Sequence, residues 1–176
     1  MTKLSITLLL LLAACSAKGA TEDFVLSAAK AADRTVTWQA KSILKADFTC
    51  QGKTEFAILG TSQIHIVVAV FRPPSKRPLD VLRYSATARS PESAVLEIEP
   101  LDFDIKELER DVGYIPDGLQ PSKTCVGLNM TDQMSDSAHI YWHRQRKRFE
   151  NWVLYPECGL TPRSSGAPTA GHQGPV

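Results

Sequence analysis

The sequence predicts a mainly β fold of the α+β class, a single small domain of antiparallel sheet with one or two short helices. The chain has 176 residues, which is enough for one ordinary domain. Several short segments alternate apolar with polar residues or are apolar throughout, and Pro, Gly, Asn and Asp separate them. Apolar residues at helical spacing occur only in two short stretches. Together these patterns place the globular domain at residues 23–158.

The first element predicted is a short amphipathic helix in "EDFVLSAAKAADR". Its apolar residues from Phe24 to Ala32 recur at nearly helical intervals. Glu22 and Asp23 stand at its start, where acidic residues favour a helix N-terminus. A later stretch, "DIKELERDVG", predicts one or two further helical turns.

Strands follow the first helix. Thr35–Leu44 alternates apolar with polar residues and predicts a half-buried strand. Ile64–Phe71 is apolar on both faces and predicts a central strand, with His65 as a core histidine. "RPPSKRP" predicts a turn, because proline cannot donate to a strand ladder. Further strands are predicted in "FAILG", "LDVLRYSA", "SAVLEIEP" and "TCVGLNM".

The last predicted element is the hairpin "SAHIYWHRQRKRFENWVLY", with Ile140 and Trp142 pointing inward. His139 and His143 would lie about 13 Å apart on the other face, at roughly 3.3 Å per residue, which is too far for one zinc ion. That face is predicted to be exposed. The hairpin tip is basic, whereas Glu92–Asp111 holds eight acidic and two basic residues.

The N-terminus, "MTKLSITLLLLLAACSAKG", has a basic start and an apolar run too short for the roughly 20 residues of a membrane span. "LAAC" resembles the lipobox of bacterial lipoproteins. The resemblance implies a signal peptide at residues 1–14, acylation of Cys15 and a lipidated tether at residues 15–22. The alternative is an ordinary signal peptide cleaved after Ala17. Ser16 replaces the Asp of inner-membrane retention signals, so the resemblance favours the outer membrane, with the domain facing the periplasm.

The overall charge favours no polyanionic partner. The chain has 20 basic and 19 acidic residues, and cleavage before Cys15 removes Lys3, which leaves the mature chain formally neutral. No nucleic acid is therefore expected as a partner. Residues 159–176 are rich in Gly, Pro, Ser, Ala and Thr and predict a disordered tail.

Three cysteines remain after Cys15: Cys50, Cys125 and Cys158. In an oxidising periplasm they predict one disulfide and one leftover thiol, and their spacing leaves three pairings open. Cys50–Cys125 is favoured because both residues lie beside predicted strands, whereas Cys158 falls where the ordered pattern ends.

The stretch "ADFTCQGKTEFAILG" places Asp47, Thr49, Gln51 and Glu55 at alternating positions around Gly52. It resembles the aspartate loop of FG-GAP and VCBS-type extracellular proteins, which implies a calcium site. Two of the aspartates in that pattern are Thr and Gln here, so the loop keeps only two carboxylates. A structural turn, in which Asp47 accepts backbone N–H groups, is the favoured interpretation; an occupied cation site is the alternative.

Together with this loop, Ser122–Trp152 resembles a group of small bacterial envelope proteins that have one degenerate aspartate loop and a late H-x-Y-W hairpin. The resemblance implies architecture and no particular chemistry. The chain contains no G-x-S-x-G, P-loop, H-E-x-x-H or dinucleotide fingerprint, and no cofactor is predicted.

The first hypothesis for function is a non-catalytic binding or structural lipoprotein of the envelope. Its predicted partner surface is the basic hairpin, with Tyr141, His143, Arg144, Arg146, Lys147 and Trp152. The alternative is an inhibitor or immunity protein against a toxic envelope hydrolase. An enzyme that uses His65 as a base ranks last.

Overall fold

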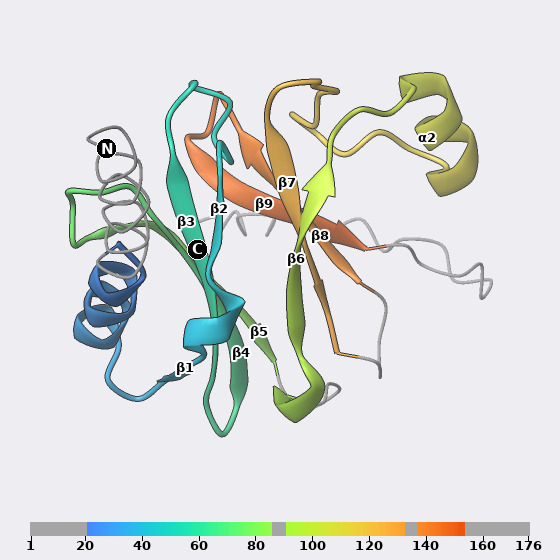
Figure 1. The fold of residues 1–176 in the computed structure, drawn as a ribbon. Helices are drawn as coiled ribbons and strands as arrows, with labels where there is room; N and C mark the ends of the chain where they lie inside the picture. Colours follow the sequence, from blue (N-terminus) through green and yellow to red (C-terminus); the bar gives the residue numbers. More distant parts are fainter. Residues whose placement is uncertain (1–20, 86–90, 133–136, 154–176) are drawn as a thin grey trace, which may run out of the picture.

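Two antiparallel sheets pack face to face in the computed structural model, which describes residues 21–85, 91–132 and 137–153 (Figure 1). Sheet A contains β1 (Thr37–Trp38), β2 (Leu44–Ala46), β3 (Glu55–Thr61), β4 (His65–Phe71) and β5 (Pro78–Ser85). Sheet B contains β6 (Val95–Pro100), β7 (Val126–Thr131), β8 (Ala138–His143) and β9 (Arg148–Val153). The predicted fold class is confirmed. The predicted signal peptide, Cys15, Cys158 and the predicted tail lie outside the described residues.

Side-chain alternation along β3 and β4 builds two cores on opposite faces of sheet A. Ile66, Val68 and Val70 of β4 face sheet B, where they join apolar side chains of β6, β7, β8 and β9. Val67 and Phe71 of β4 face the other way, toward the helix at residues 21–32. The uniformly apolar β4 is therefore covered on both sides, as its sequence predicts.

The helix at residues 21–32 covers the outer face of sheet A, on the left of Figure 1. Val25, Ala28 and Ala29 are buried against the sheet. The predicted amphipathic helix is confirmed, although residues 21 and 22, which were assigned to the tether, are already helical. No helix among residues 21–85, 91–132 and 137–153 is long and apolar enough to cross a membrane.

The single strand predicted at Thr35–Leu44 is wrong in part, because β1 and β2 replace it, with a 3₁₀ turn at Ala40–Ser42 between them. Both short strands pair with β3. The Ser42 hydroxyl accepts the Leu59 N–H at 2.9 Å and donates to the Gln39 carbonyl at 2.7 Å. This side chain takes the place of a backbone partner at the interruption, a local alternative that Ser commonly offers.

The outer face of sheet B is partly covered by α2 (Ile105–Val112) and by residues 113–125 (Figure 1). Asp104 caps α2 by accepting the N–H groups of Lys106 and Glu107, and Gly113 ends it at φ 82°. The predicted second helix is confirmed. Leu101, Leu119, Cys125 and Tyr141 form a third, smaller core beneath this cover.

Candidate functional site

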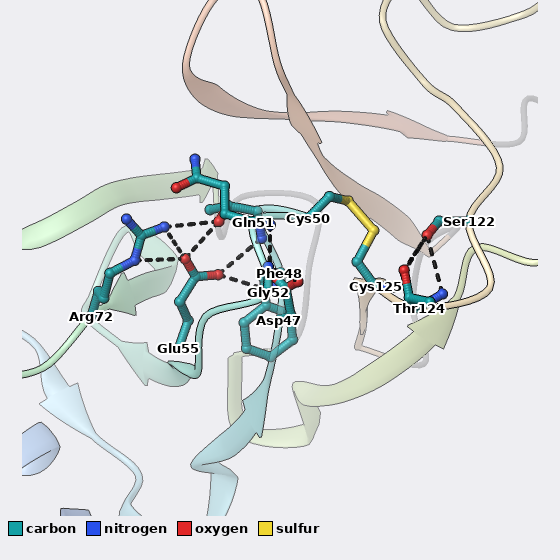
Figure 2. Close-up of a disulfide and its surroundings, with 11 residues drawn as sticks. Asp47, Phe48, Cys50, Gln51, Gly52, Glu55, Arg72, Ser122, Thr124 and Cys125 are labelled. Atoms are coloured by element: carbon teal, nitrogen blue, oxygen red, sulfur yellow. Dashed lines mark hydrogen bonds and ion pairs between the residues drawn. A yellow bond between two sulfur atoms is a disulfide. The ribbon is translucent and has the colours of Figure 1, made fainter.

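The loop that precedes β3 is a tight turn held by Asp47. Its carboxylate accepts the N–H of Gln51 at 3.0 Å and that of Gly52 at 2.7 Å (Figure 2). Gly52 has φ 67°, a left-handed conformation that glycine adopts without strain. These contacts are the ones that the structural-turn interpretation predicts.

Glu55, the other carboxylate of this loop, lies in the protein interior. Its Oε2 accepts the N–H groups of Phe48 and Thr49, each at 2.9 Å, and its Oε1 accepts the Thr49 hydroxyl at 2.7 Å. Arg72 also donates to Oε1, with its Nε at 3.0 Å (Figure 2). Arg72 is the first residue of the predicted "RPPSKRP" turn, and its guanidinium pairs with Glu55.

The predicted disulfide is confirmed. Cys50 and Cys125 are joined across a sequence separation of 75 residues, with their Cα atoms 5.0 Å apart (Figure 2). Close to this link, the Val126 N–H donates to the Asp47 carbonyl at 3.2 Å. The disulfide thus ties the Asp47 turn to the start of β7 in the other sheet.

Tyr141 and His143, two members of the predicted partner surface, are buried, so the expectation that this face of the hairpin is exposed is wrong. Residues 113–125 cover them, and the Tyr141 hydroxyl donates to the Asp117 carbonyl at 2.7 Å. Burial, followed by the nearby Glu150 and Asp117 carboxylates, raises the pKa of Tyr141 to about 12. Tyr141 therefore holds residues 113–125 against sheet B through this hydrogen bond.

His143 lies beneath the same loop. Its Nε2–H donates to an Asp117 carboxylate oxygen at 3.3 Å, and its Nδ1 accepts the Arg146 N–H at 3.3 Å. A Cβ atom added at Gly118 would come within 2.6 Å of the imidazole ring. The ring therefore fits only because residue 118 has no side chain.

Two of the four cations at the hairpin tip, Arg146 and Arg148, are paired with carboxylates. Arg146 donates to Glu150 at 2.8 Å and to Asp117 at 2.7 Å, and Arg148 donates to Glu150 at 2.9 Å. The hydrogen bond from Arg146 is the main cause of a lowered pKa at Glu150. Of the predicted basic surface residues, Arg144 and Lys147 are exposed and form no ion pair within the described part of the chain. The field at this tip is therefore weaker than the sequence predicts.

Trp152 lies at the opposite end of the hairpin from His143. Its ring stacks on His139 with the ring centroids 4.1 Å apart, and the two residues are cross-strand partners in β8 and β9. The His139 Nδ1–H donates to Oε1 of Glu99, from β6, at 2.6 Å. His139 Nε2 is buried and has no hydrogen-bond partner in the described structure. A carboxylate, an imidazole and an indole thus meet across the outer face of sheet B.

A cleft of about 170 Å³ opens where α2 and the chain around it meet this face of sheet B. We call it the α2 cleft. The side chains that give it polar or aromatic character are Glu99, His139, Tyr141 and Trp152. The side chains that make its apolar walls are Leu101, Phe103, Leu108 and Leu119. The lining of the cleft therefore combines a carboxylate and aromatic rings with aliphatic side chains.

Two larger depressions are more open. One, of about 420 Å³, lies beside the Asp47 turn, and the other, of about 400 Å³, lies beside Asp117 and His143. The polar groups of Asp47, Asp117 and His143 are already hydrogen-bonded within the protein. No group of three or more His, Cys, Asp or Glu side chains placed to share a metal ion occurs among the described residues.

His65, the residue considered as a base, is at the first position of β4 and is partly exposed, so its prediction as a core histidine is wrong. The turn before β4 ends there: the His65 N–H donates to the Ser62 hydroxyl at 3.1 Å, and its carbonyl accepts the Ser62 N–H. The predicted strand, Ile64–Phe71, begins two residues before the buried part, which starts at Ile66.

Sequence reasoning missed Glu99, Phe103 and Leu108 as members of a site. Alternation in "SAVLEIEP" does place Glu97 and Glu99 on one face of a strand. Only the pairing order β6-β7-β8-β9 brings that face beside His139, and only the fold of residues 101–125 provides the opposite wall. Comparison of the chain with protein-family models, with curated proteins and with solved structures gave no match.

Proposed function

We propose that this protein is a non-catalytic, lipid-anchored component of the bacterial envelope that binds a protein partner through the α2 cleft. The lipobox-like "LAAC" ending at Cys15 supports the anchor and the outer-membrane location. The observation that carries the binding role is the α2 cleft, a mainly apolar recess whose lining includes one carboxylate.

The size of the cleft favours a side chain of a protein as the ligand. Sites for drug-sized molecules typically enclose about 300–1,000 Å³. The α2 cleft has about 170 Å³, equivalent to five or six waters at about 30 Å³ each. A space of this size accommodates one large side chain, and such anchors in small pockets dominate the binding energy of many protein interfaces.

The walls of the cleft are suited to rigid docking. Cys125 and Leu119 are buried in the core beneath the cover of sheet B, and the Cys50–Cys125 disulfide fixes one end of the covering segment. The Tyr141–Asp117 hydrogen bond holds the segment nearer its middle. A preformed recess lowers the ordering cost of binding.

Site-specific photocrosslinking tests the binding role. A photoreactive phenylalanine analogue at Phe103, in the cleft wall, is expected to trap one defined partner in intact envelopes. The same group at Ile64, an exposed position (67%) in the β3–β4 turn of sheet A and outside the cleft, serves as the control. Equal trapping from both positions would argue against the cleft as the binding site.

A pair of variants at Leu108 sharpens this test. Leu108→Lys places a positive charge in the apolar cleft wall, which disfavours both an apolar and a basic side chain, and should abolish trapping from Phe103. Leu108→Met keeps an apolar side chain of similar volume and should preserve trapping. Thermal unfolding checks that both variants are folded. Persistent trapping in Leu108→Lys would overturn the assignment. A hydrolase as the trapped species would identify the protein as an inhibitor.

The anchor has its own test. Replacing Cys15 with Ser should prevent incorporation of labelled palmitate and move the protein from the membrane fraction to the soluble periplasmic fraction. Unchanged membrane association would contradict lipidation.

A further inference from the structure

We propose that the α2 cleft is selective for the cationic side chain of a lysine or arginine on the partner protein. This inference rests on the proposed function, because it names the chemistry that the same cleft would select.

The carboxylate of Glu99 is the first element of this selectivity. Its Oε1 accepts the His139 Nδ1–H, while its Oε2 has no hydrogen bond or ion pair with any described residue. The side chain is 23% exposed and lines the cleft, so Oε2 is not sequestered with a partner elsewhere. An ammonium or guanidinium group would give this oxygen a charge-assisted hydrogen bond, which is stronger than a neutral one.

The walls of the cleft complement the rest of such a side chain. Leu101 and Leu108 provide an aliphatic surface, and the long stems of lysine and arginine pack readily on apolar surfaces while their charged ends reach a polar group. Phe103 and Trp152 add aromatic rings, which attract cations electrostatically. One cleft thus contains a partner for each part of a basic side chain.

Charge around the cleft acts in the same direction. Glu92–Asp111, which supplies β6 and α2 to its border, contains eight acidic and two basic residues. Asp102, between these elements, is exposed and forms no ion pair within the described chain. A negative border speeds the approach of a basic partner surface and disfavours an acidic one.

Neutral and anionic side chains fit less well. An aliphatic side chain would occupy the walls but would cover Glu99 Oε2 without giving it a donor, which carries a desolvation cost. A carboxylate would lie close to the charge of Glu99. A basic side chain is the occupant that suits both the apolar walls and the Glu99 carboxylate.

The test uses three small probes and the whole mature chain in detergent. The Nα-acetyl methylamides of lysine and arginine carry a cationic side chain. The Nα-acetyl methylamide of norleucine has an aliphatic side chain without the charge. Binding is followed by NMR at the indole N–H of Trp152, which is assigned by its loss in Trp152→Phe. Both cationic probes should shift this signal saturably, at least tenfold more tightly than norleucine, with affinity that falls as salt rises.

Two variants separate the roles of neighbouring carboxylates. Glu99→Gln should weaken the cationic probes at least tenfold and leave norleucine unchanged. Glu97→Gln, two residues away on the same face of β6, should leave all three probes unchanged. Unaltered Trp38 and Trp142 indole signals establish that each variant is folded. If Glu99→Gln does not fold, the comparison of lysine with norleucine in the unaltered chain still decides whether the cleft selects a cation.

Norleucine binding as tightly as lysine, or lysine binding unaffected by Glu99→Gln, would overturn selectivity for a cation. The proposed function would then stand with an apolar anchor, because crosslinking from Phe103 tests it separately. Absence of a Trp152 shift with every probe would also overturn the inference, and loss of crosslinking would overturn the proposed function itself.

Discussion

Arg72 reaches from the end of β4 to Glu55 at the start of β3, where it pairs with a carboxylate that is fully buried. The Arg72 side chain is 24% exposed, so the pair joins the protein interior to its surface. The Glu55 carboxylate also accepts hydrogen bonds from the N–H groups of Phe48 and Thr49. The turn, for which the sequence leaves a calcium site as the alternative, is thus organised around a buried carboxylate that pairs with Arg72.

Removal of this arginine should be costly. Arg72→Ala leaves the buried Glu55 carboxylate without its cation, and loss of one member of a buried pair typically costs about 3–5 kcal/mol of unfolding free energy. Urea unfolding measures the change. Arg77→Ala, in the same turn, is the control: Arg77 is exposed, its side chain forms no ion pair within the described residues, and its loss should change stability by less than about 0.5 kcal/mol. Equal effects of the two variants would show that Glu55 does not depend on Arg72.

The disulfide should contribute measurably to stability. Replacing Cys50 and Cys125 with Ser removes a link across 75 residues and should lower the unfolding free energy by about 2–4 kcal/mol. Thermal unfolding with and without reductant checks this. Reductant should destabilise the unaltered protein and have no effect on the double variant. An unaltered protein that is insensitive to complete reduction would contradict the prediction.

Tyr141 should make stability depend on alkaline pH. Its pKa in the folded protein is about 12, above the ordinary value of 10.0, because burial and then the nearby carboxylates disfavour the phenolate. The folded state holds the phenolic proton more tightly than the unfolded state does. The contribution of Tyr141 to the unfolding free energy is therefore complete below pH 10 and is lost as pH rises from about 10 to 12. Unfolding free energy measured across this range should fall less steeply in Tyr141→Phe.

Tyr114→Phe is the matched control for that measurement, because Tyr114 is 44% exposed. Its pH profile should follow that of the unaltered protein. In addition, Tyr141→Phe should lower the unfolding free energy by about 0.5–1.5 kcal/mol at neutral pH, because the Asp117 carbonyl loses its hydrogen-bond donor. Identical alkaline profiles in the unaltered protein and Tyr141→Phe would contradict the assignment.

Gly118 and Gly52 provide a comparison between a clash and backbone strain alone. Both have positive φ, 75° and 67°. An alanine Cβ at position 118 would meet the His143 ring at 2.6 Å, whereas at position 52 it would meet nothing within 4 Å. Gly52→Ala should lower the unfolding free energy by about 1–2 kcal/mol through backbone strain alone. Gly118→Ala should lower it by about 1–3 kcal/mol more, because of the clash with the His143 ring. Equal costs in urea unfolding would show that the loop moves freely away from His143.

Local pattern was sufficient for much of the fold. Continuous apolarity in Ile64–Phe71 predicted the central strand, and helical spacing after Glu22 predicted the helix that covers sheet A. The position of Cys50 and Cys125 beside strands favoured the correct pairing. These features depend on side-chain periodicity and on neighbours in the chain, both of which can be read directly from the order of residues.

The interrupted strand at residues 37–46 shows where local pattern fails. Alternation in Thr35–Leu44 fits one continuous strand, but Ser42 bonds to Gln39 and to Leu59 of β3 instead. The pattern cannot show that a distant N–H group is available to a hydroxyl. A side chain can replace a ladder partner only when another strand presents that group.

The sequence by itself determined the periodicity of each strand, the two helices, the alternation of faces and the lipobox-like start. Only the tertiary structure decided what each face meets. Residues 113–125 cover Tyr141 and His143, Asp117 and Glu150 neutralise Arg146, and β6 brings Glu99 to His139. The physical reason is that period-two alternation assigns a side chain to one face of its strand, whereas burial and charge pairing depend on distant segments that pack against that face.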